Sequence, residues 1–189
     1  MSIAFSTNYR KILEAIIYIL HKHHLVAKSI FILKCLYYAD KYHLQKYASP
    51  ITGDAFVKLK HGPCATSAYN ILQKNELYIP YEILSEVEKS IKVFNKRGAG
   101  DRHTSYKALR EPNTSVFSES NVECLDDAID FCSSFKDNYT LSIESHKELA
   151  WKNVDYREVM SYEDMIDTDT ENREEIIEYL QEYSRSLCL

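Results

Sequence analysis

Glycine and proline are scarce in this sequence, which has only four of each among 189 residues. Both residue types interrupt helices, because glycine is conformationally free and proline lacks a backbone N–H donor. The composition also excludes a disordered chain, since 45% of the residues are hydrophobic and 15 are tyrosines. We therefore expect a folded chain in which helices dominate.

Paired cysteines and a secretory signal are missing as well. The five cysteines are an odd number and none are spaced as C-x-x-C. The sequences around Cys35, Cys124 and Cys132 are apolar, which predicts reduced, buried thiols. No basic start followed by an apolar run and a small-residue cleavage site opens the chain, so we expect it to stay in the cytoplasm.

The sequence also lacks the common catalytic motifs. It has no Gly-x-Ser-x-Gly, no phosphate-binding loop and no ligand spacing typical of zinc. His21 and His24 supply two imidazoles close together, but neither a Cys nor a carboxylate lies near them in the sequence. We therefore expect no enzymatic activity, no cofactor and no metal.

A long apolar stretch from Ser29 to Tyr47 is the element around which we expect the chain to fold. It contains no glycine or proline, and its first half has almost no polar side. Such a helix is buried and central. Its polar second half and Lys34 make it too interrupted to span a membrane. Lys34 should reach the surface or meet a carboxylate, because burying an unpaired amine is costly.

Shorter patterns predict further helices and a small sheet around this central helix. Helices are expected from Asn8 to about His23, at 64–74 with Pro63 as first residue, at 81–87, from Ser118 or Ser120 to about Phe135, from Thr140 onward and at 169–187. Strands are expected around 55–59 and as a hairpin of 90–95 and 103–109. The fold class is thus α+β and mainly α, with residues 1–189 forming one compact domain that includes a small antiparallel sheet.

Charge is unevenly distributed, although the net charge is only -5. Residues 89–110 contain seven Lys or Arg against Asp101, and residues 155–182 contain eleven acidic residues against two Arg. The basic stretch supports one hypothesis, a regulator that binds nucleic acid through the hairpin, but the sequence pI of about 5.8 counts against it. The hairpin residues concerned are Lys92, Lys96, Arg97, Arg102 and Lys107.

Five polar residues in and after the central helix form our candidate cluster: Lys34, Asp40, His43, Asp54 and His61. Asp40 and His43 are three residues apart and share a helix face, so the carboxylate could orient the imidazole for acid–base chemistry. Asp54 and His61 follow in the next predicted turn and strand end. An enzyme built on Asp40 and His43 is one interpretation. We favour another, in which the group fixes the junction of sheet and helices by hydrogen bonds.

Four ordered blocks of sequence carry a family resemblance. The blocks are Lys34-Cys-Leu-Tyr-Tyr-Ala-Asp40, His43-Leu-Gln-Lys-Tyr47, Pro50-Ile-Thr-Gly-Asp54 and Lys60-His-Gly-Pro63, and a weaker one combines Leu141-Ser-Ile-Glu-Ser-His146 with Ala150-Trp151. This pattern resembles the Panacea domain, the SocA-like family, over about residues 10–152. Cys35 and Cys64 depart from the family's usual residues in a way that should change only packing.

The resemblance implies an antitoxin without enzymatic activity, which neutralises a protein toxin encoded beside it by direct binding. Panacea proteins occur in bacteria and phages, and the SocA-like member is an adaptor that delivers its toxin to a protease. The implied partners are therefore a cognate toxin and, in the adaptor alternative, a protease; no membrane partner is expected.

The acidic stretch after Asp155 lies outside the matched blocks and is our candidate for a variable binding surface. It could meet a basic toxin, or it could cover the basic hairpin of its own chain. The residues selected as protein-binding are Tyr162, Glu171, Glu175, Glu178, Tyr179 and Glu182.

Overall fold

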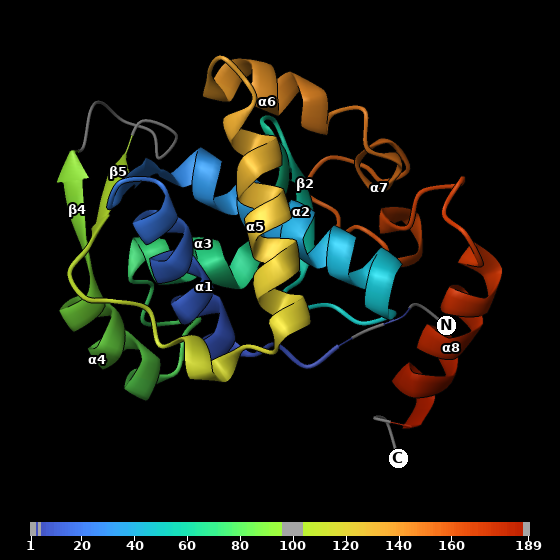
Figure 1. Cartoon of the computed structure of the whole chain (residues 1–189), viewed down its shortest axis with the longest axis horizontal. Helices are drawn as coiled ribbons and strands as arrows, with labels where there is room; N and C mark the ends of the chain where they lie inside the picture. Colours follow the sequence, from blue (N-terminus) through green and yellow to red (C-terminus); the bar gives the residue numbers. More distant parts are fainter. Residues whose placement is uncertain (1–2, 4, 96–103, 187–189) are drawn as a thin grey trace.

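The computed structural model describes residue 3, residues 5–95 and residues 104–186, and these residues form eight α-helices and five strands (Figure 1). The helices are α1 (Tyr9–Lys22), α2 (Ser29–Tyr47), α3 (Thr66–Gln73), α4 (Tyr81–Ser90), α5 (Glu119–Ser133), α6 (Asn138–Ser145), α7 (Leu149–Lys152) and α8 (Arg173–Ser186). The strands are β1 (Val26–Lys28), β2 (Phe56–Leu59), β3 (Gly62–Ala65), β4 (Ile91–Asn95) and β5 (Ser105–Ala108). The predicted class, α+β and mainly α, is confirmed.

Helix α2 lies at the centre of the molecule and has the predicted bounds. Every residue from 31 to 41 is buried, as expected for a helix that is apolar on all sides. Helix α5 crosses it along much of its length (Figure 1). The helix ends where Ala48 adopts a left-handed conformation with φ of 50°.

Helix α1 begins where the sequence predicted, because the Asn8 side chain accepts a hydrogen bond from the Lys11 amide at 3.0 Å. Its burial is wider than the expected apolar stripe. All nine residues from Ile12 to Leu20 are buried, including the charged Glu14. A buried carboxylate requires a partner, which the site description below identifies.

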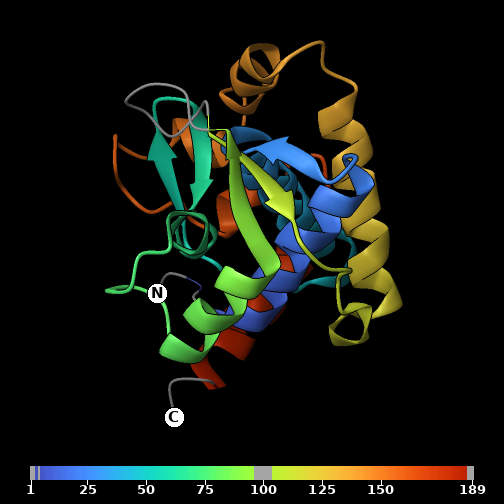
Figure 2. The ribbon, with the colours of Figure 1, turned by 90° about the vertical axis from the view of Figure 1, so that its left-hand side faces the viewer.

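Two small antiparallel sheets pack against the helices (Figure 2). One has the strand order β1-β5-β4 and contains the predicted hairpin, whose loop, with Lys96, Arg97 and Arg102, lies outside the described residues. The other pairs β2 with β3. Pro63 therefore lies in β3, and the prediction that it begins a helix is wrong.

The segment from residue 137 to residue 152 forms two helices instead of the single one predicted from Thr140. Asp137 begins α6 earlier, since its carboxylate accepts hydrogen bonds from the amides of Tyr139 and Thr140. The chain then turns at 146–148 before the short α7. Trp151 is half-buried at the margin of the core and donates to the Leu59 carbonyl at 3.2 Å.

Helix α8 begins at Arg173, a few residues after the predicted caps Asp169 and Thr170. Leu180 is fully buried, and Ile176 and Ile177 pack against the core beside it. The helix lies at the opposite end of the molecule from β4 and β5 (Figure 1). The alternative in which the acidic C-terminal helix covers the basic hairpin of its own chain is therefore wrong for β4 and β5, the described strands of that hairpin.

The cysteines, the hydropathy of the helices and the possible metal ligands are the remaining features of the fold. Cys35, Cys64, Cys124 and Cys132 are buried thiols that form no disulfide bond, which confirms the prediction for three of them, and Cys188 lies outside the described residues. Among the described helices, none combines the length and the hydropathy needed to cross a bilayer. The described residues also contain no group of three or more His, Cys, Asp or Glu side chains placed to hold a metal ion.

Candidate functional site

The Asp40 carboxylate ties helix α2 to the loop that follows it. Its Oδ1 accepts hydrogen bonds from the amides of Ile51 and Thr52 at 2.9 and 3.0 Å, and its Oδ2 accepts one from the Thr52 hydroxyl at 2.5 Å. Burial raises the pKa of Asp40 to about 7, against the opposing effect of these hydrogen bonds. Asp40 thus uses both carboxylate oxygens on the loop that follows its own helix.

Asp54 caps helix α3 from outside the helix. Its two carboxylate oxygens accept from the amides of Ser67 and Ala68, each at 2.9 Å. These amides are among the first N–H groups of the helix, which have no partner within it. Burial raises the pKa of Asp54, and the hydrogen bonds from the helix amides lower it. A helix start without a local cap is stabilised in this way by a distant carboxylate.

His43 joins the C-terminal end of α2 to α5. Its Nδ1 lies 2.6 Å from the Ser49 carbonyl oxygen, and its Nε2 lies 2.9 Å from Nδ2 of Asn121. Since a carbonyl only accepts, Nδ1 carries the proton and Nε2 accepts from the Asn121 amide. Burial lowers the pKa of His43, which favours this neutral form. Asp40 and His43 bond different partners, so the carboxylate does not orient the imidazole.

Lys34 is buried, and the prediction that it reaches the surface or meets a carboxylate is wrong. The residue is 2% exposed, and its amine donates a hydrogen bond to the Pro63 carbonyl at 2.7 Å. Desolvation lowers the pKa of Lys34 to about 7. An amine buried in this way needs an acceptor, and the carbonyl supplies it. His61 lies in the β2–β3 turn, where its carbonyl accepts from the Ser142 hydroxyl at 3.0 Å.

The five predicted residues therefore serve several junctions. Asp40 and Asp54 lie near each other. Lys34 bonds to β3, His43 bonds to α5, and the His61 carbonyl bonds to α6. Their hydrogen bonds join segments of the chain that are apart in the sequence. The five residues therefore connect helices, strands and loops within the fold. They do not bring a nucleophile and a base together.

Tyr162 is not part of an exposed binding surface, so its selection as a protein-binding residue is wrong. The side chain is 6% exposed, and its hydroxyl donates to the Asp54 carbonyl at 2.7 Å. The ring meets Phe5 edge to face at 4.9 Å between centroids. The segment before α8 folds back into the core at Tyr162. The acidic residues around Tyr162 in the sequence had suggested an exposed segment instead. The other selected residues, Glu171, Glu175, Glu178, Tyr179 and Glu182, are exposed on or just before α8.

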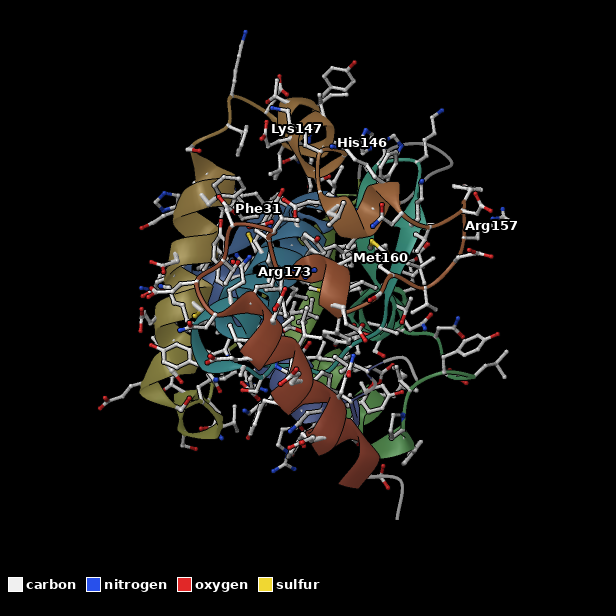
Figure 3. The ribbon with its side chains drawn as sticks, turned by 90° about the vertical axis from the view of Figure 1, so that its right-hand side faces the viewer. Phe31, His146, Lys147, Arg157, Met160 and Arg173 are labelled. Atoms are coloured by element: carbon white, nitrogen blue, oxygen red, sulfur yellow. The ribbon has the colours of Figure 1, made fainter. Side chains whose placement is uncertain are left out.

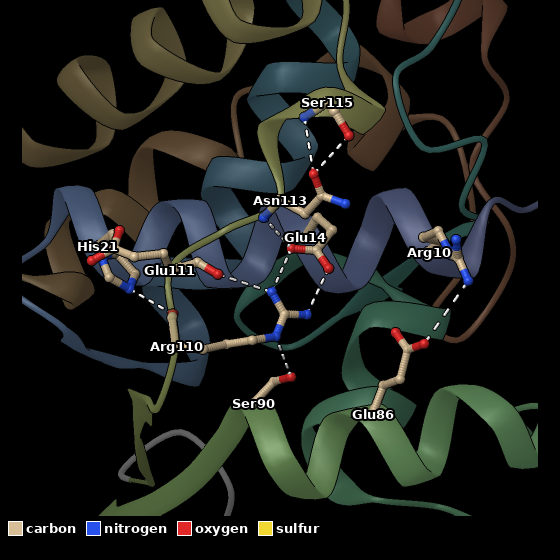
Figure 4. A network of polar contacts seen from close by, with 9 residues as sticks. All are labelled: Arg10, Glu14, His21, Glu86, Ser90, Arg110, Glu111, Asn113 and Ser115. Carbon is tan, nitrogen blue, oxygen red and sulfur yellow. Dashed lines mark hydrogen bonds and ion pairs between the residues drawn. The ribbon is translucent and has the colours of Figure 1, made fainter.

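A buried ion pair that sequence reasoning missed links α1 to the segment after β5 (Figure 4). Arg110 donates to both carboxylate oxygens of Glu14, at 2.6 and 2.9 Å, and the Asn113 amide donates to the same carboxylate at 2.7 Å. The Arg110 Nε also donates to the Ser90 hydroxyl. The available signal was Glu14 itself, a charge inside the run from Ile12 to Leu20. Arg110, counted in the basic stretch, is committed to this pair.

Two adjoining surface cavities lie along helix α8, and we call them together the α8 groove. One, of about 330 Å³, lies between the N-terminal segment, the 48–53 loop, Tyr179 and Tyr183. The other, of about 460 Å³, is lined by Gln45, Lys46, Ala48, residues 170–172, Glu175, Ile176 and Tyr179. Ala48 and Tyr179 line both cavities. Figure 3 faces this side of the molecule, with Arg173 at the start of α8.

The protein is thus a mainly helical α+β domain. The polar residues of its sequence blocks hold loops and a helix start around a buried central helix. The chain belongs to the family described as Antitoxin SocA-like, Panacea domain, whose model matches residues 32–152. The match begins inside α2, later than the residue 10 suggested by the sequence blocks, and ends with α7, so α1 and α8 lie outside it. Comparisons with curated proteins and with solved structures give no match.

Proposed function

We propose that this protein is an antitoxin that binds a protein toxin encoded beside it and blocks the toxin by direct contact, in the cytoplasm and without catalysis. The observation that carries the proposal is the family match over residues 32–152, which runs from the first turn of α2 to the end of α7. The family description assigns an antitoxin-like role. The cognate toxin and the blocking mechanism are our proposal.

The use of the motif residues supports a binding role. Asp40, His43 and Asp54 bond to backbone and side-chain groups of the chain and so tie loops and a helix start to the core. Segments held in place before binding lose less conformational entropy when a partner binds. Its motif then serves the scaffold, and the partner is contacted elsewhere.

Exposed aromatic side chains supply candidate contacts for a partner. A few aromatic anchors usually carry most of the binding energy of a protein interface, and charges mainly guide the encounter. Tyr81 is 81% exposed at the start of α4, next to Leu77 and Tyr78 in the preceding loop. Tyr179 and Tyr183 are 56% and 45% exposed on α8.

The test is a growth assay with the neighbouring gene. The adjacent reading frame is expressed from one inducible promoter and this chain from another. We expect the adjacent product alone to stop growth and this chain to restore it. A control variant, Leu36→Asp, places a charge in the fully buried helix α2 and should abolish rescue by unfolding the domain.

Toxin abundance, measured on the same cultures, separates blocking from delivery to a protease. Blocking predicts that growth returns while the toxin level is unchanged. Growth restored with loss of the toxin would contradict blocking and favour the adaptor alternative. Continued growth arrest with folded antitoxin present would contradict the antitoxin function itself.

A further inference from the structure

We propose that the α8 groove is the toxin-binding surface and that it takes a basic segment of the toxin in which a Lys or Arg lies beside an apolar residue. This inference rests on the proposed antitoxin function and specifies its partner surface. Two features of the groove support it: the aromatic side chains that line it and its unbalanced charge.

The groove offers apolar contact on a firmly held helix. Tyr179 contributes to both cavities, and Phe5, Ile51 and Tyr183 add further apolar surface to the first one. Helix α8 is held by the buried Leu180 and by Arg173, which donates to the carbonyls of Ile166 and Glu163, each at 3.1 Å. An aromatic side chain presented from a fixed helix is a typical anchor for a partner segment.

The charge of the groove is negative and is not balanced from within. Glu171 and Glu175 line the second cavity and are exposed, and none of the ion pairs of the described residues involves either of them. Lys46 lines the same cavity, but Glu123 and Asp127 hold its amine at 3.0 and 2.7 Å. A cationic side chain from a partner is the complement of this arrangement.

The proposed occupant is a polypeptide because the proposed partner is a protein toxin. A peptide can place a basic side chain beside Glu171 and Glu175 and an apolar side chain on Tyr179, which line the same cavity. A simple cation would use only the carboxylates.

The experiment compares two charge reversals at neighbouring positions. The test variant is Glu171→Lys with Glu175→Lys, and the control is Asp169→Lys with Glu174→Lys, whose exposed side chains line neither cavity. Both variants change the net charge equally and on the same helix or beside it. The probe is the purified product of the adjacent reading frame, with Kd measured by titration calorimetry and folding checked by the Tm of each variant.

We expect the test variant to bind about tenfold or more weakly and the control to stay within about threefold of wild type. A second pair, Tyr179→Ala against Tyr139→Ala on α6, removes an exposed tyrosine inside and outside the groove without changing charge. Tyr179→Ala should bind the toxin more weakly than Tyr139→Ala, and this comparison holds even if a charge reversal lowers the Tm. Equal Kd values for wild type, test and control would overturn the groove while leaving the antitoxin function intact. A wild-type chain that does not bind the adjacent product would overturn the antitoxin proposal, and the groove proposal with it.

Discussion

The side-chain amine of Lys34 donates a hydrogen bond to the carbonyl oxygen of Pro63 across 2.7 Å inside the core. This contact joins the central helix α2 to strand β3. Gly62, the residue before Pro63, has φ of 93° and lets the backbone approach Lys34 closely. The first and last of the four sequence blocks therefore meet in space. The glycine of the last block makes room for the lysine of the first.

Replacing Gly62 tests this contact. A Cβ at residue 62 would lie 2.1 Å from the Ser145 hydroxyl oxygen and 2.5 Å from the Lys34 amine, both buried. Overpacking and the positive φ together predict that Gly62→Ala lowers the free energy of unfolding by about 2–4 kcal/mol. Urea denaturation measures the change. Adding Ser145→Ala should recover part of the loss, and a Gly62→Ala protein as stable as wild type would contradict the packing described here.

The pH dependence of stability tests the state of Lys34. Burial lowers its pKa to about 7 in the folded protein, below the value of about 10.4 typical of an unfolded chain. Between these values the unfolded chain binds more protons at Lys34, so this residue makes the folded state more stable as the pH rises. In Lys34→Met that contribution is absent. The difference in unfolding free energy, wild type minus variant, should increase by about 2 kcal/mol from about pH 7 to about pH 9.

Taking that difference removes the contributions of groups that both proteins share. Burial raises the pKa of Cys35 and of Tyr37, whose titration acts on stability in the opposite direction at alkaline pH. A difference that stays constant over this range would show that Lys34 keeps its ordinary pKa in the fold.

Asp54 should stabilise the protein by capping α3. Asp54→Ala leaves the amides of Ser67 and Ala68 buried without their acceptor, which predicts a loss of about 1–3 kcal/mol. Asp137→Ala is the matched control, because Asp137 caps α6 at an exposed position, where water can replace it. Hydrogen exchange at residues 67 and 68 should accelerate in Asp54→Ala. A larger loss of stability in Asp137→Ala would contradict the role assigned to burial.

Removing Arg110 should expose the cost of the buried Glu14 carboxylate. The Glu14 side chain is 5% exposed and the Arg110 side chain 34%. Arg110→Met leaves the carboxylate without its cation and should cost about 2–4 kcal/mol. The double variant with Glu14→Gln should lose less than the sum of the two single losses. Additive losses in thermal or urea unfolding would show that the two residues are not coupled.

Local sequence patterns predicted the helices well because the local signals agree with the tertiary structure. The apolar run from 29 to 47 and the Asn8 and Ser118 caps placed α1, α2 and α5 correctly. Pro63 misled, since the cap of α3 comes from Asp54, which lies far from the helix start in sequence. Strand β1 has only three residues and was missed for lack of a pattern.

The site was harder to predict than the fold, since contacts between distant residues leave no periodic trace. Glu14 and Arg110 are 96 residues apart in the sequence, and Tyr162 packs against Phe5 and donates to the Asp54 carbonyl. Charge composition indicated an acidic face around α8. It could not show that Gln45 and Tyr179 would line the same cavity.

Inhibition of the purified toxin by the purified chain, with no other protein present, tests the central claim most directly. If neutralisation is by direct contact, toxin activity should fall in proportion to added antitoxin and reach a plateau at a fixed molar ratio, and the two proteins should elute together from a gel-filtration column. Full toxin activity in excess antitoxin, with the two proteins eluting separately, would contradict it.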